Sequence, residues 1–363
     1  MKESAVMPLK IAFITQVVDE DDPVLGFTCG WINAMAKLVE RIEVICLRKE
    51  KHHLAGNVSV NVMPEGKLRR FFYLRNFLKK AICEKSINAV FAHMCPIYAW
   101  TASTALKHRI PLGLWYAHPA TSFTLGLAAK SCDVIFTSAE GGFPFFSNKV
   151  IITGQGIDTE KFTPEAIQKN KENIRIISVG RLSPVKRYEI SVRAIKMLKE
   201  KLPALNLTYD IYGPMVTDDS REYSNRLIKL ACEYGISEIF KLRGAVLYNE
   251  MPKIYSQADI VIDMMHGSLD KSALEACACA VPVIVANKNF HETFGRYADI
   301  LIANSPTAEA IAEKIEKIIS MTAAERNQIG GYLREQVIER HSLDSLMKKI
   351  VAKYEAKIKE HVQ

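Results

Sequence analysis

Short apolar segments alternate with longer polar, helix-periodic stretches along almost the whole chain. In the first half the apolar segments are rich in Val, Ile and Phe, and they are KIAFITQVV (10–18), IEVICLR (42–48), INAVFAHM (87–94), IPLGLWYA (110–117) and CDVIFTSA (132–139). In the second half the pattern returns as IRIISVG (174–180), LTYDIYG (207–213), IFKLRG (239–244), DIVIDMM (259–265) and VPVIVAN (281–287). Buried parallel strands joined by crossover helices have this pattern.

The two sets of strands are separated by a turn-rich and then charged segment, GQGIDTEKFTPEAIQKNKEN (154–173). A change of this kind is typical of a domain boundary. We therefore expect two doubly wound α/β domains joined near 163–173, the first over 1–165 and the second over 166–344.

The chain ends in a helical stretch at about 345–363. One face of this stretch is apolar, with Leu346, Ile350, Val351 and Tyr354. We expect it to pack on one of the two domains, with a return to the first domain as one arrangement.

Length and composition fit a cytoplasmic protein without membrane-spanning segments. The chain has 363 residues, and no apolar run reaches the ~18 residues that a membrane-spanning helix needs. The opening MKESAVMPLKIAFITQ lacks the long apolar segment of a signal peptide. The eight cysteines form no CxxC pair, which favours reduced thiols, and Cys277 and Cys279 have no second pair with which to bind a metal.

The segment VGRLSPVKRYE (179–189) follows a predicted strand and carries two cations in a short loop. Gly180 allows a tight turn, Arg181 presents a planar fork of donors, and Lys186 adds a point charge near the start of the next helix. Open α/β sheets bind ligands at the carboxyl ends of their strands, and a helix N-terminus attracts anions. The pair suits a diphosphate, although two solvated surface cations would give the same pattern.

A second loop and helix, HGSLDKSALEACACA (266–280), follow another predicted strand. Gly267 and Ser268 allow backbone N–H groups to face an anion. Glu275 lies on the following helix, and an acid beside phosphate-binding loops accepts hydrogen bonds from a ribose diol. Taken alone, Glu275 fits an acid on a helix surface better.

Together, VGRLSPVKRYE and SALEACACAVPVIVAN resemble the donor-binding half of retaining GT-B glycosyltransferases, in the nucleotide-sugar-dependent family often called family 4. GQGIDTEKFTPE resembles the interdomain segment of that family, and YDIYGPM, LRGAVLYNEMPKIYSQADIVI and HSLDSLMKKIVAKY continue the resemblance in order. The resemblance covers about residue 150 to the C-terminus and, more loosely, the N-terminal half. It implies an α/β GT-B fold with two Rossmann-like domains facing across a cleft, the first for the acceptor and the second for the donor.

The resemblance also implies roles for individual residues. Arg181 and Lys186, after Gly180, match the pair that holds the donor diphosphate and neutralises the leaving group, and Glu275 matches the acid that binds the ribose. The remaining matches are to loops whose backbone contacts the nucleobase, at Gly244 and Val246, and the distal phosphate, at Ser268 and Leu269.

One position departs from the family. A second Glu usually lies eight residues before the ribose acid, near the donor sugar, and here that position is Gly267. Asp270 or Lys271 would then contact the sugar hydroxyls instead. The departure puts the identity of the donor, and to a smaller extent the activity, in doubt.

The N-terminal half is expected to hold the acceptor. Gly26 and Gly30 follow the first strand and precede a helix, so their backbone N–H groups are placed for a phosphate or a sugar, or for a plain strand-to-helix turn. His118 ends a predicted strand, and strand-end histidines of the family lie near the reacting sugar. His93 ends another strand, where a structural role fits as well.

The net charge of +8 is partly concentrated in KLRRFFYLRNFLKKAICEK (67–85), which has seven cations and several aromatics. A helix of this kind either rests on an anionic membrane leaflet or is a domain helix with a solvated cationic face, and the two are compatible. No pattern of a nucleic-acid-binding motif accompanies the charge.

We therefore expect metal-independent, retaining transfer from a UDP- or GDP-sugar to a glycan or lipid-linked acceptor, in cell-surface polysaccharide or glycolipid synthesis. Arg181, Lys186, His118 and Asp270 are the predicted catalytic residues. The phosphate cations replace a metal ion in this scheme, and the sequence has no Asp-x-Asp motif at a strand end. A catalytically impaired partner subunit and a sugar-nucleotide epimerase on the same fold stay open as alternatives.

Overall fold

The computed structural model describes residues 8–167 and 173–362, and the chain separates into two compact units. Unit 1 comprises Met1–Gly156 and Leu343–Gln363, and unit 2 comprises Ile157–Ser342. The opening segment 1–7 and the part of the predicted junction at 168–172 lie outside the described residues.

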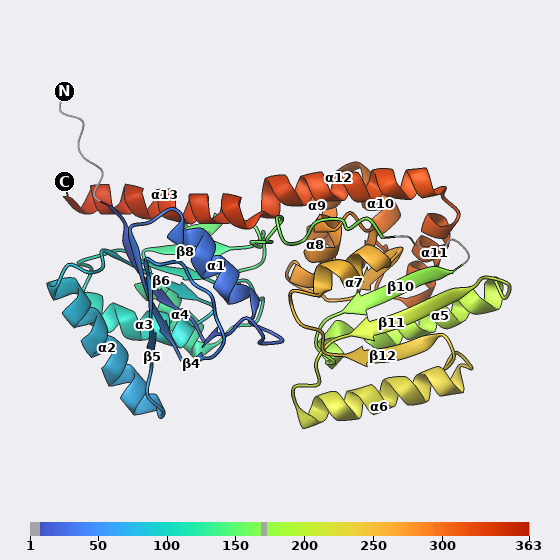
Figure 1. The fold of residues 1–363 in the computed structure, drawn as a ribbon, viewed down its shortest axis with the longest axis horizontal. Coiled ribbons are helices and arrows are strands. Elements are labelled where there is room, and N and C mark those ends of the chain that lie inside the picture. Colours follow the sequence, from blue (N-terminus) through green and yellow to red (C-terminus); the bar gives the residue numbers. More distant parts are fainter. Residues whose placement is uncertain (1–7, 168–172, 363) are drawn as a thin grey trace. The chain divides into compact units, whose positions relative to one another are not determined.

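Unit 1 is built on a seven-stranded parallel sheet in the order β5-β3-β1-β6-β7-β8-β9. Figure 1 shows helices packed around this sheet. Its strands are β1 (Lys10–Ile14), β3 (Arg41–Cys46), β5 (Val58–Val62), β6 (Ala89–His93), β7 (Leu112–Trp115), β8 (Val134–Thr137) and β9 (Val150–Ile152). A separate ribbon pairs β2 (Val17–Val18) with β4 (Arg48–Lys49).

Helices cover both faces of this sheet. They are α1 (Phe27–Ala36), α2 (Lys67–Cys83), α3 (Pro96–Leu106), α4 (Phe123–Ser131) and α13 (Leu343–Val362). Successive residues of a strand point to opposite faces, so Phe13 joins a core with α1 and α13, and Ile14 joins a second core with α2, α3 and α4. The result is a three-layer, doubly wound arrangement.

The C-terminal helix α13 packs on unit 1 through the face that the sequence marked as apolar. Leu346, Ile350, Val351 and Tyr354 are all buried. The Tyr354 hydroxyl donates to the Val90 carbonyl at 2.6 Å. A Cβ at Gly113 would lie 2.4 Å from that hydroxyl, so the glycine makes room for the tyrosine.

Unit 2 is built on a five-stranded parallel sheet in the order β12-β11-β10-β13-β14. Its strands are β10 (Ile174–Val179), β11 (Leu207–Tyr212), β12 (Phe240–Gly244), β13 (Ile260–Asp263) and β14 (Val283–Val285). The order reverses at β10, where β11 lies on one side and β13 on the other, and such a switch point leaves a crevice at the carboxyl ends of the strands.

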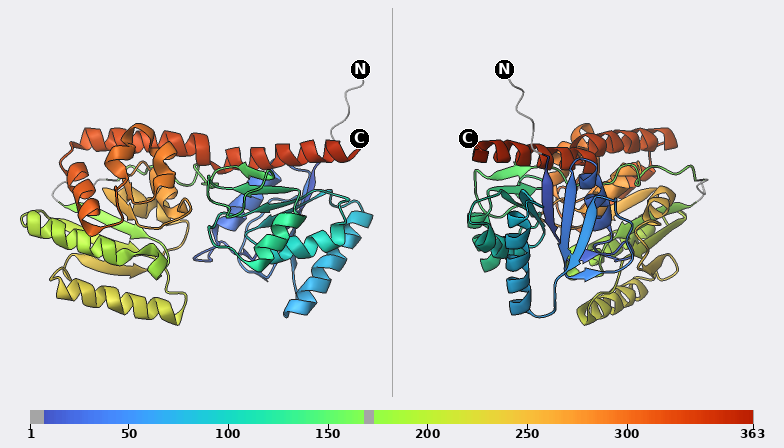
Figure 2. Two further views of the ribbon diagram at one scale, coloured as in Figure 1. Left: turned by 180° about the vertical axis from the view of Figure 1, so that it is seen from behind. Right: turned by 60° about the vertical axis from the view of Figure 1, so that its left-hand side comes forward.

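The helices of unit 2 alternate with its strands (Figures 1 and 2). They are η1 (Pro184–Lys186), α5 (Tyr188–Lys201), α6 (Asp218–Glu233), α7 (Met251–Gln257), α8 (Lys271–Ala278), η2 (Lys288–Phe290), α9 (His291–Phe294), η3 (Gly295–Tyr297), α10 (Ala298–Leu301), α11 (Ala308–Ile319) and α12 (Ala323–His341). No helix among the described residues combines the length and the apolar character needed to cross a bilayer.

Residues 157–165, which the sequence assigned to the first domain, belong to unit 2. Ile157 pairs with Ser342 in an isolated bridge. The Arg334 guanidinium donates to the Phe162 carbonyl at 2.7 Å, and the Phe162 side chain is fully buried. These long-range contacts place the boundary between the two units after Gly156. In the sequence, Pro164 and the charged residues after it had indicated a later boundary.

Candidate active site

The loop after β10 turns at Gly180 so that Lys186 lies directly over it. Gly180 has a φ of +142°, and a Cβ there would lie 2.4 Å from Lys186 Cε and 2.6 Å from its Nζ. A Cβ at Gly213 would lie 1.9 Å from the Gly180 carbonyl oxygen. The Tyr188 hydroxyl donates to the same oxygen at 2.9 Å. Two glycines therefore let three chain segments meet at the end of β10.

Lys186 is buried, with three acceptors around its ammonium group. They are an Asp270 carboxylate oxygen, Ser272 Oγ at 3.4 Å and the Val179 carbonyl at 3.4 Å. A second carboxylate, Asp263, lies 3.8 Å from the same nitrogen. Burial alone would lower the pKa of Lys186, but the charges of Asp270 and Asp263 outweigh it and raise that pKa.

The pKa values of the two buried acids beside Lys186 are shifted in opposite directions. Burial raises the pKa of Asp263 to about 8, helped by the charge of Asp270. Burial also acts on Asp270, but Lys186 outweighs it and lowers the Asp270 pKa. Asp270 Oδ1 in addition accepts from the Ser272 N–H at 3.2 Å as the N-cap of α8. Asp270, the acid with the lowered pKa, is therefore the one that pairs with the Lys186 ammonium group.

Arg181 is exposed at the start of the same loop. Its positive charge lowers the pKa of Lys186 slightly, so the two cations are close enough to interact. Lys186 is held by protein groups, whereas the Arg181 guanidinium faces water. The more accessible of the two predicted phosphate contacts is therefore Arg181.

Glu275 is buried further along α8, where two tyrosines hold it. Tyr248 donates to Oε1 at 3.1 Å and Tyr255 to Oε2 at 3.3 Å. Burial raises the Glu275 pKa to about 7, although Lys271 and both tyrosines oppose the shift. Burial also lowers the pKa of the half-buried Lys271 to about 8, against the charge of Glu275.

The glycines of two predicted ligand-binding loops have positive φ. Gly267 has a φ of +104°, and the next carbonyl, of Ser268, accepts from Asn287 Nδ2 at 2.9 Å. The side chains of Ser268 and Leu269 are buried, so only their backbone can meet a ligand. Gly244, with a φ of +76°, ends β12 and begins the loop through Val246 to Tyr248.

The predicted residues of unit 1 do not all lie where the sequence placed them. The expectation that Gly30 precedes a helix is wrong, because α1 begins at Phe27 and Gly30 lies inside it. Gly26 is the N-cap, and a Cβ there would lie 2.8 Å from two carbonyl oxygens of the preceding loop. His118 is exposed beyond β7, and its Nδ1 accepts from the Ala120 N–H at 3.0 Å.

His93, at the end of β6, is buried among aromatic rings. Its ring centroid lies 4.8 Å from that of Trp31, 5.5 Å from Trp115 and 5.6 Å from Phe27. This environment supports the structural role that the sequence left open for His93.

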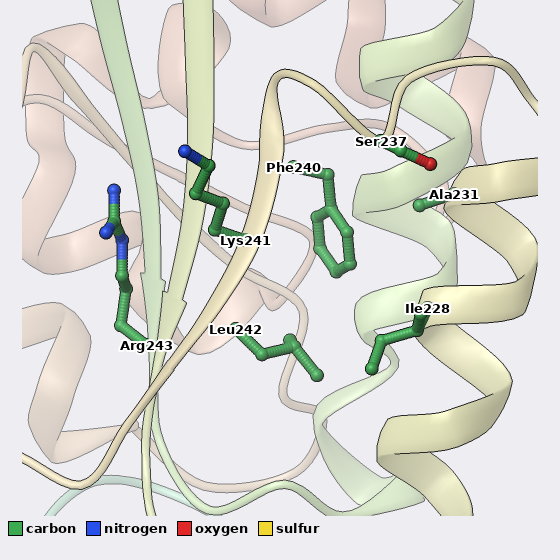
Figure 3. A pocket seen from close by; sticks show the side chains of 7 residues that line it. All are labelled: Ile228, Ala231, Ser237, Phe240, Lys241, Leu242 and Arg243. Carbon is green, nitrogen blue, oxygen red and sulfur yellow. The ribbon is translucent and has the colours of Figure 1, made fainter.

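A cavity of about 310 Å³ lies at the outer edge of the second sheet and involves none of the predicted residues. Figure 3 shows Phe240 and Leu242 of β12 pointing into it together with Ile228 of α6, whereas Lys241 and Arg243 point the other way.

Within residues 8–167 and 173–362, no three His, Cys, Asp or Glu side chains gather as ligands for a metal.

The structure thus brings together Gly180, Arg181, Lys186, Asp270 and Glu275 within unit 2. Sequence reasoning missed Asp263, Tyr248 and Tyr255. The sequence could have indicated Asp263, because this acid ends the apolar run of the predicted strand DIVID. Nothing in the sequence indicated Tyr248 and Tyr255, because their partner Glu275 lies 27 and 20 residues away in the chain.

Cations beside an accessible backbone suit the binding of a phosphate group, and a carboxylate held by hydrogen bonds suits the binding of a diol.

The chain is similar to known glycosyltransferases. Residues 159–336 match the family described as "Glycosyl transferases group 1". A D-inositol 3-phosphate glycosyltransferase of Salinispora arenicola is 27% identical over 154 residues, which are 38% of this chain and 34% of that protein. The GDP-Man:Man(3)GlcNAc(2)-PP-Dol alpha-1,2-mannosyltransferase of Xenopus laevis is 26% identical over 223 residues, 56% of this chain and 45% of that one. The chain spans about a third of the length of the curated inositol phosphate relatives.

Solved structures resemble the whole chain. A glycosyltransferase from Rickettsia africae has a TM-score of 0.77 at 14% identity, covering 97% of this chain and 99% of that one. The Anabaena protein HepE in complex with UDP-glucose has a TM-score of 0.77 at 15% identity, covering 96% and 100%. The chain therefore has the α/β GT-B fold with two Rossmann-like domains, and its residues 159–336, just under half of the chain, are similar to the group 1 glycosyltransferases.

Proposed function

We propose that this protein transfers a sugar from a nucleotide-diphosphate sugar to an acceptor hydroxyl with retention of configuration, as a family 4 type enzyme. One observation carries the proposal: residues predicted from separate loops converge on α8. Lys186 is bound to the N-cap residue Asp270, and Glu275 lies on the same helix within reach of the Asp270 charge. A lysine suited to a diphosphate and an acid suited to a ribose diol therefore lie against and on one helix, beside the switch point of the sheet, which supports the proposal.

In this reaction the acceptor oxygen bonds to C1 of the sugar on the face from which the diphosphate departs. The C1–O bond breaks, its electron pair leaves with the nucleoside diphosphate, and a phosphate oxygen takes the acceptor proton. Arg181 and Lys186 stabilise the negative charge in place of a metal ion, so no cofactor is needed. Backbone at Gly244 and Val246 meets the base, and N–H groups at Ser268 and Leu269 meet the distal phosphate.

The contacts of Lys186 indicate how the donor engages it. An ammonium group has three N–H donors, and three acceptors already surround this one. The bonds to Val179 and Ser272, both 3.4 Å long, are weak, whereas the pair with Asp270 is charged. A donor phosphate therefore replaces Val179 or Ser272 while Asp270 stays bound. Asp270 or Lys271 is left to contact the sugar hydroxyls, and His118 serves the acceptor side.

The donor is a UDP- or GDP-sugar in this proposal, and the acceptor is a glycan or a lipid-linked glycan of cell-surface polysaccharide or glycolipid synthesis at the cytoplasmic side. The names of the relatives support this set of donors and acceptors but do not select one of them. One name includes an inositol phosphate, and another includes GDP-mannose. HepE was crystallised with UDP-glucose.

A catalytically impaired partner subunit is the second candidate. Gly267 in place of the first family acid favours it, and so does the internally bound Lys186. Such a protein would bind the nucleotide without turning it over. An epimerase on the same fold would instead isomerise the nucleotide sugar without any acceptor.

A donor screen followed by a turnover assay tests these candidates. Melting temperature is measured with each of UDP-glucose, UDP-galactose, UDP-N-acetylglucosamine, GDP-mannose, UDP and GDP, because a donor above its Kd raises the melting temperature. The stabilising sugar nucleotide is then incubated with the protein, and release of nucleoside diphosphate is followed with and without glycan acceptors. Release accompanied by a retained glycosidic product supports the transferase. Binding without release identifies the partner subunit, and an isomerised sugar nucleotide identifies the epimerase.

A further inference from the structure

Strand β12 (Phe240–Gly244) lies at one end of the unit 2 sheet, next to β11, and Figure 1 shows α6 beyond it. Within the described part of the chain, no strand pairs with the outer side of β12. The Tyr209 N–H donates to the Ile239 carbonyl at 2.7 Å, which fixes the register of the parallel ladder. The backbone N–H and C=O groups of Lys241 therefore point to β11, and those of Leu242 point outward. An edge of this kind can take up a further strand.

The cavity of about 310 Å³ follows this edge. Four consecutive residues, Phe240 to Arg243, line it, although successive side chains of a strand point to opposite faces of the sheet. A cavity that touches all four must run along the backbone at the edge of the strand. The remaining residues that line it are Ile228, Ala231 and Ser237. This course suits an extended chain segment better than a compact ligand.

The side of the edge that faces α6 is apolar. Figure 3 shows Phe240, Leu242 and Ile228 pointing into the cavity from β12 and α6. The Ile228 side chain is 54% exposed, so an apolar side chain placed in the cavity would remove it from water. A segment beside β12 would therefore turn apolar side chains to this face.

The other side of the edge is positively charged. Lys241 and Arg243 are exposed there, and Lys241 is in register with Asp210 of β11. Arg243 Nε donates to the Asp210 carboxylate at 2.9 Å, and an Arg175 nitrogen lies 3.6 Å from the same carboxylate. Three cations therefore surround one buried acid, which leaves an excess of two positive charges. The exposed acid Glu238 precedes the strand, so the positive charge belongs to β12 itself.

We propose that the outer edge of β12 binds an extended segment of a partner protein in which acidic and apolar residues alternate. The segment adds as a further strand beside Phe240–Arg243, with its apolar side chains in the cavity and its acidic side chains on Lys241 and Arg243. A second copy of β12 is a poor partner, because its own cations would meet like charges across the pair. The proposal goes beyond the transfer reaction and uses none of the residues that we assign to donor binding.

Peptide binding to the full chain tests it by fluorescence anisotropy. The probe is a labelled, capped peptide of sequence Glu-Val-Glu-Phe-Glu-Val-Glu. It is compared with the same residues in the order Val-Val-Phe-Glu-Glu-Glu-Glu and with Lys-Val-Lys-Phe-Lys-Val-Lys. We expect binding of the alternating acidic peptide alone. Lys241→Glu should weaken that binding about ten-fold and create binding of the lysine peptide, and Ile228→Ser should weaken it about five-fold.

Matched variants separate this edge from general charge and hydrophobicity. Lys317→Glu reverses an exposed charge on α11, which packs near β14 at the opposite end of the sheet, and Ile338→Ser replaces an apolar residue of α12 that is 43% exposed. Both should keep wild-type affinity, and circular dichroism checks that every variant is folded. Equal weakening by Lys317→Glu, or equal affinity for the scrambled peptide, would overturn recognition by the edge.

Amide hydrogen exchange followed by NMR tests the strand pairing itself. With saturating peptide, the outward N–H of Leu242 should exchange at least ten-fold more slowly, whereas the N–H of Lys241, which points to β11, should change little. Unchanged exchange at Leu242 would overturn strand addition. Absence of peptide binding, or a dimer that Lys241→Glu disrupts in sedimentation experiments, would overturn an acidic segment as the partner.

Discussion

Lys186 and Asp270 form a buried ion pair that joins the loop after β10 to the first turn of α8, across 84 positions of the chain. The pair fixes the predicted leaving-group cation before any ligand arrives. It also connects that cation, through α8, to the predicted ribose acid Glu275. The site is therefore organised by its own charges, and the predictions below follow from that organisation.

Loss of Asp270 should destabilise unit 2. Asp270→Ala leaves the Lys186 ammonium buried, and breaking a buried pair in this way costs about 3–5 kcal/mol. We expect the lower end of that range, because Asp263 lies 3.8 Å from Lys186 and can ionise in place of Asp270. Urea unfolding measures the difference. Glu222→Gln, which breaks an exposed pair with Arg226, should have no measurable effect. An Asp270→Ala protein as stable as wild type would show that the pair does not hold the loop.

Asp263 should make stability fall as pH rises. Its folded-state pKa of about 8 lies above the usual value of 3.8, so between these pH values the folded state binds a proton that the unfolded state has lost. The stabilisation is complete below about pH 4 and is lost as pH rises towards 8. Asp263→Asn should flatten this dependence. Unfolding free energies at pH 5, 6, 7 and 8 test it, and parallel profiles for the two proteins would contradict it.

Gly180→Ala should be more harmful than the same replacement at Gly66, another glycine at positive φ. Gly180 and Gly66 have φ values of +142° and +93°, but only at Gly180 would the new Cβ meet a neighbour, Lys186 Cε at 2.4 Å. Backbone strain costs about 1–3 kcal/mol at either site, and displacing Lys186 adds about 1–3 kcal/mol at Gly180. Thermal unfolding of the two alanine variants gives the comparison directly. Equal losses would mean that Lys186 moves aside freely.

Arg181→Gln should reduce turnover without reducing stability. Its guanidinium is exposed, so little packing is lost, whereas removing one donor to a developing oxyanion lowers kcat about 10²–10³-fold. Steady-state kinetics with the donor found by the screen and a urea titration measure the two effects. Arg187→Gln on the same loop is the matched control, since it removes an equal charge six residues away. A similar loss in both variants would point to general electrostatics rather than a leaving-group contact.

The parts of this fold that follow from local pattern were predictable, and the parts that follow from distant contacts were not. Fully buried strands such as β8 and β13 appear in the sequence as short, mainly apolar runs. The edge strand β5 was missed because Val58–Val62 is only half-buried and includes Ser59 and Asn61. Gly30 was misplaced because α1 begins with Phe27 and has no side-chain cap to mark its start.

The same distinction between local pattern and distant contacts applies to the candidate active site. Gly180, Arg181 and Lys186 form one short loop, so composition and spacing indicated them as candidates, and the family resemblance implied their roles. The partners that set their protonation lie on other elements: Asp263 and Asp270 come more than 70 residues later, and Tyr248 and Tyr255 reach Glu275 from β12–α7 and from α7. A single sequence indicates which side chains are suited to the chemistry. Their pairing, and the resulting shifts of pKa, depend on the sheet order.

Glu275→Gln should affect binding and stability in opposite directions. Burial holds the Glu275 pKa at about 7, above the usual 4.5, so the folded protein loses stability as pH rises from about 4.5 through 7. Glutamine has nearly the same shape but does not ionise, so the Gln variant should not lose stability over this pH range. At pH 8 it should be at least as stable as wild type, and near pH 4.5 the two unfolding free energies should be equal. The KM for the donor should rise about 10- to 100-fold, because a charged acceptor for the ribose diol is lost. Tyr255→Phe is the control, since it removes one hydrogen bond to Glu275 and leaves the acid in place. A Gln variant that loses stability at pH 8 would identify Glu275 as a structural acid, and a variant with unchanged KM would remove it from the donor site.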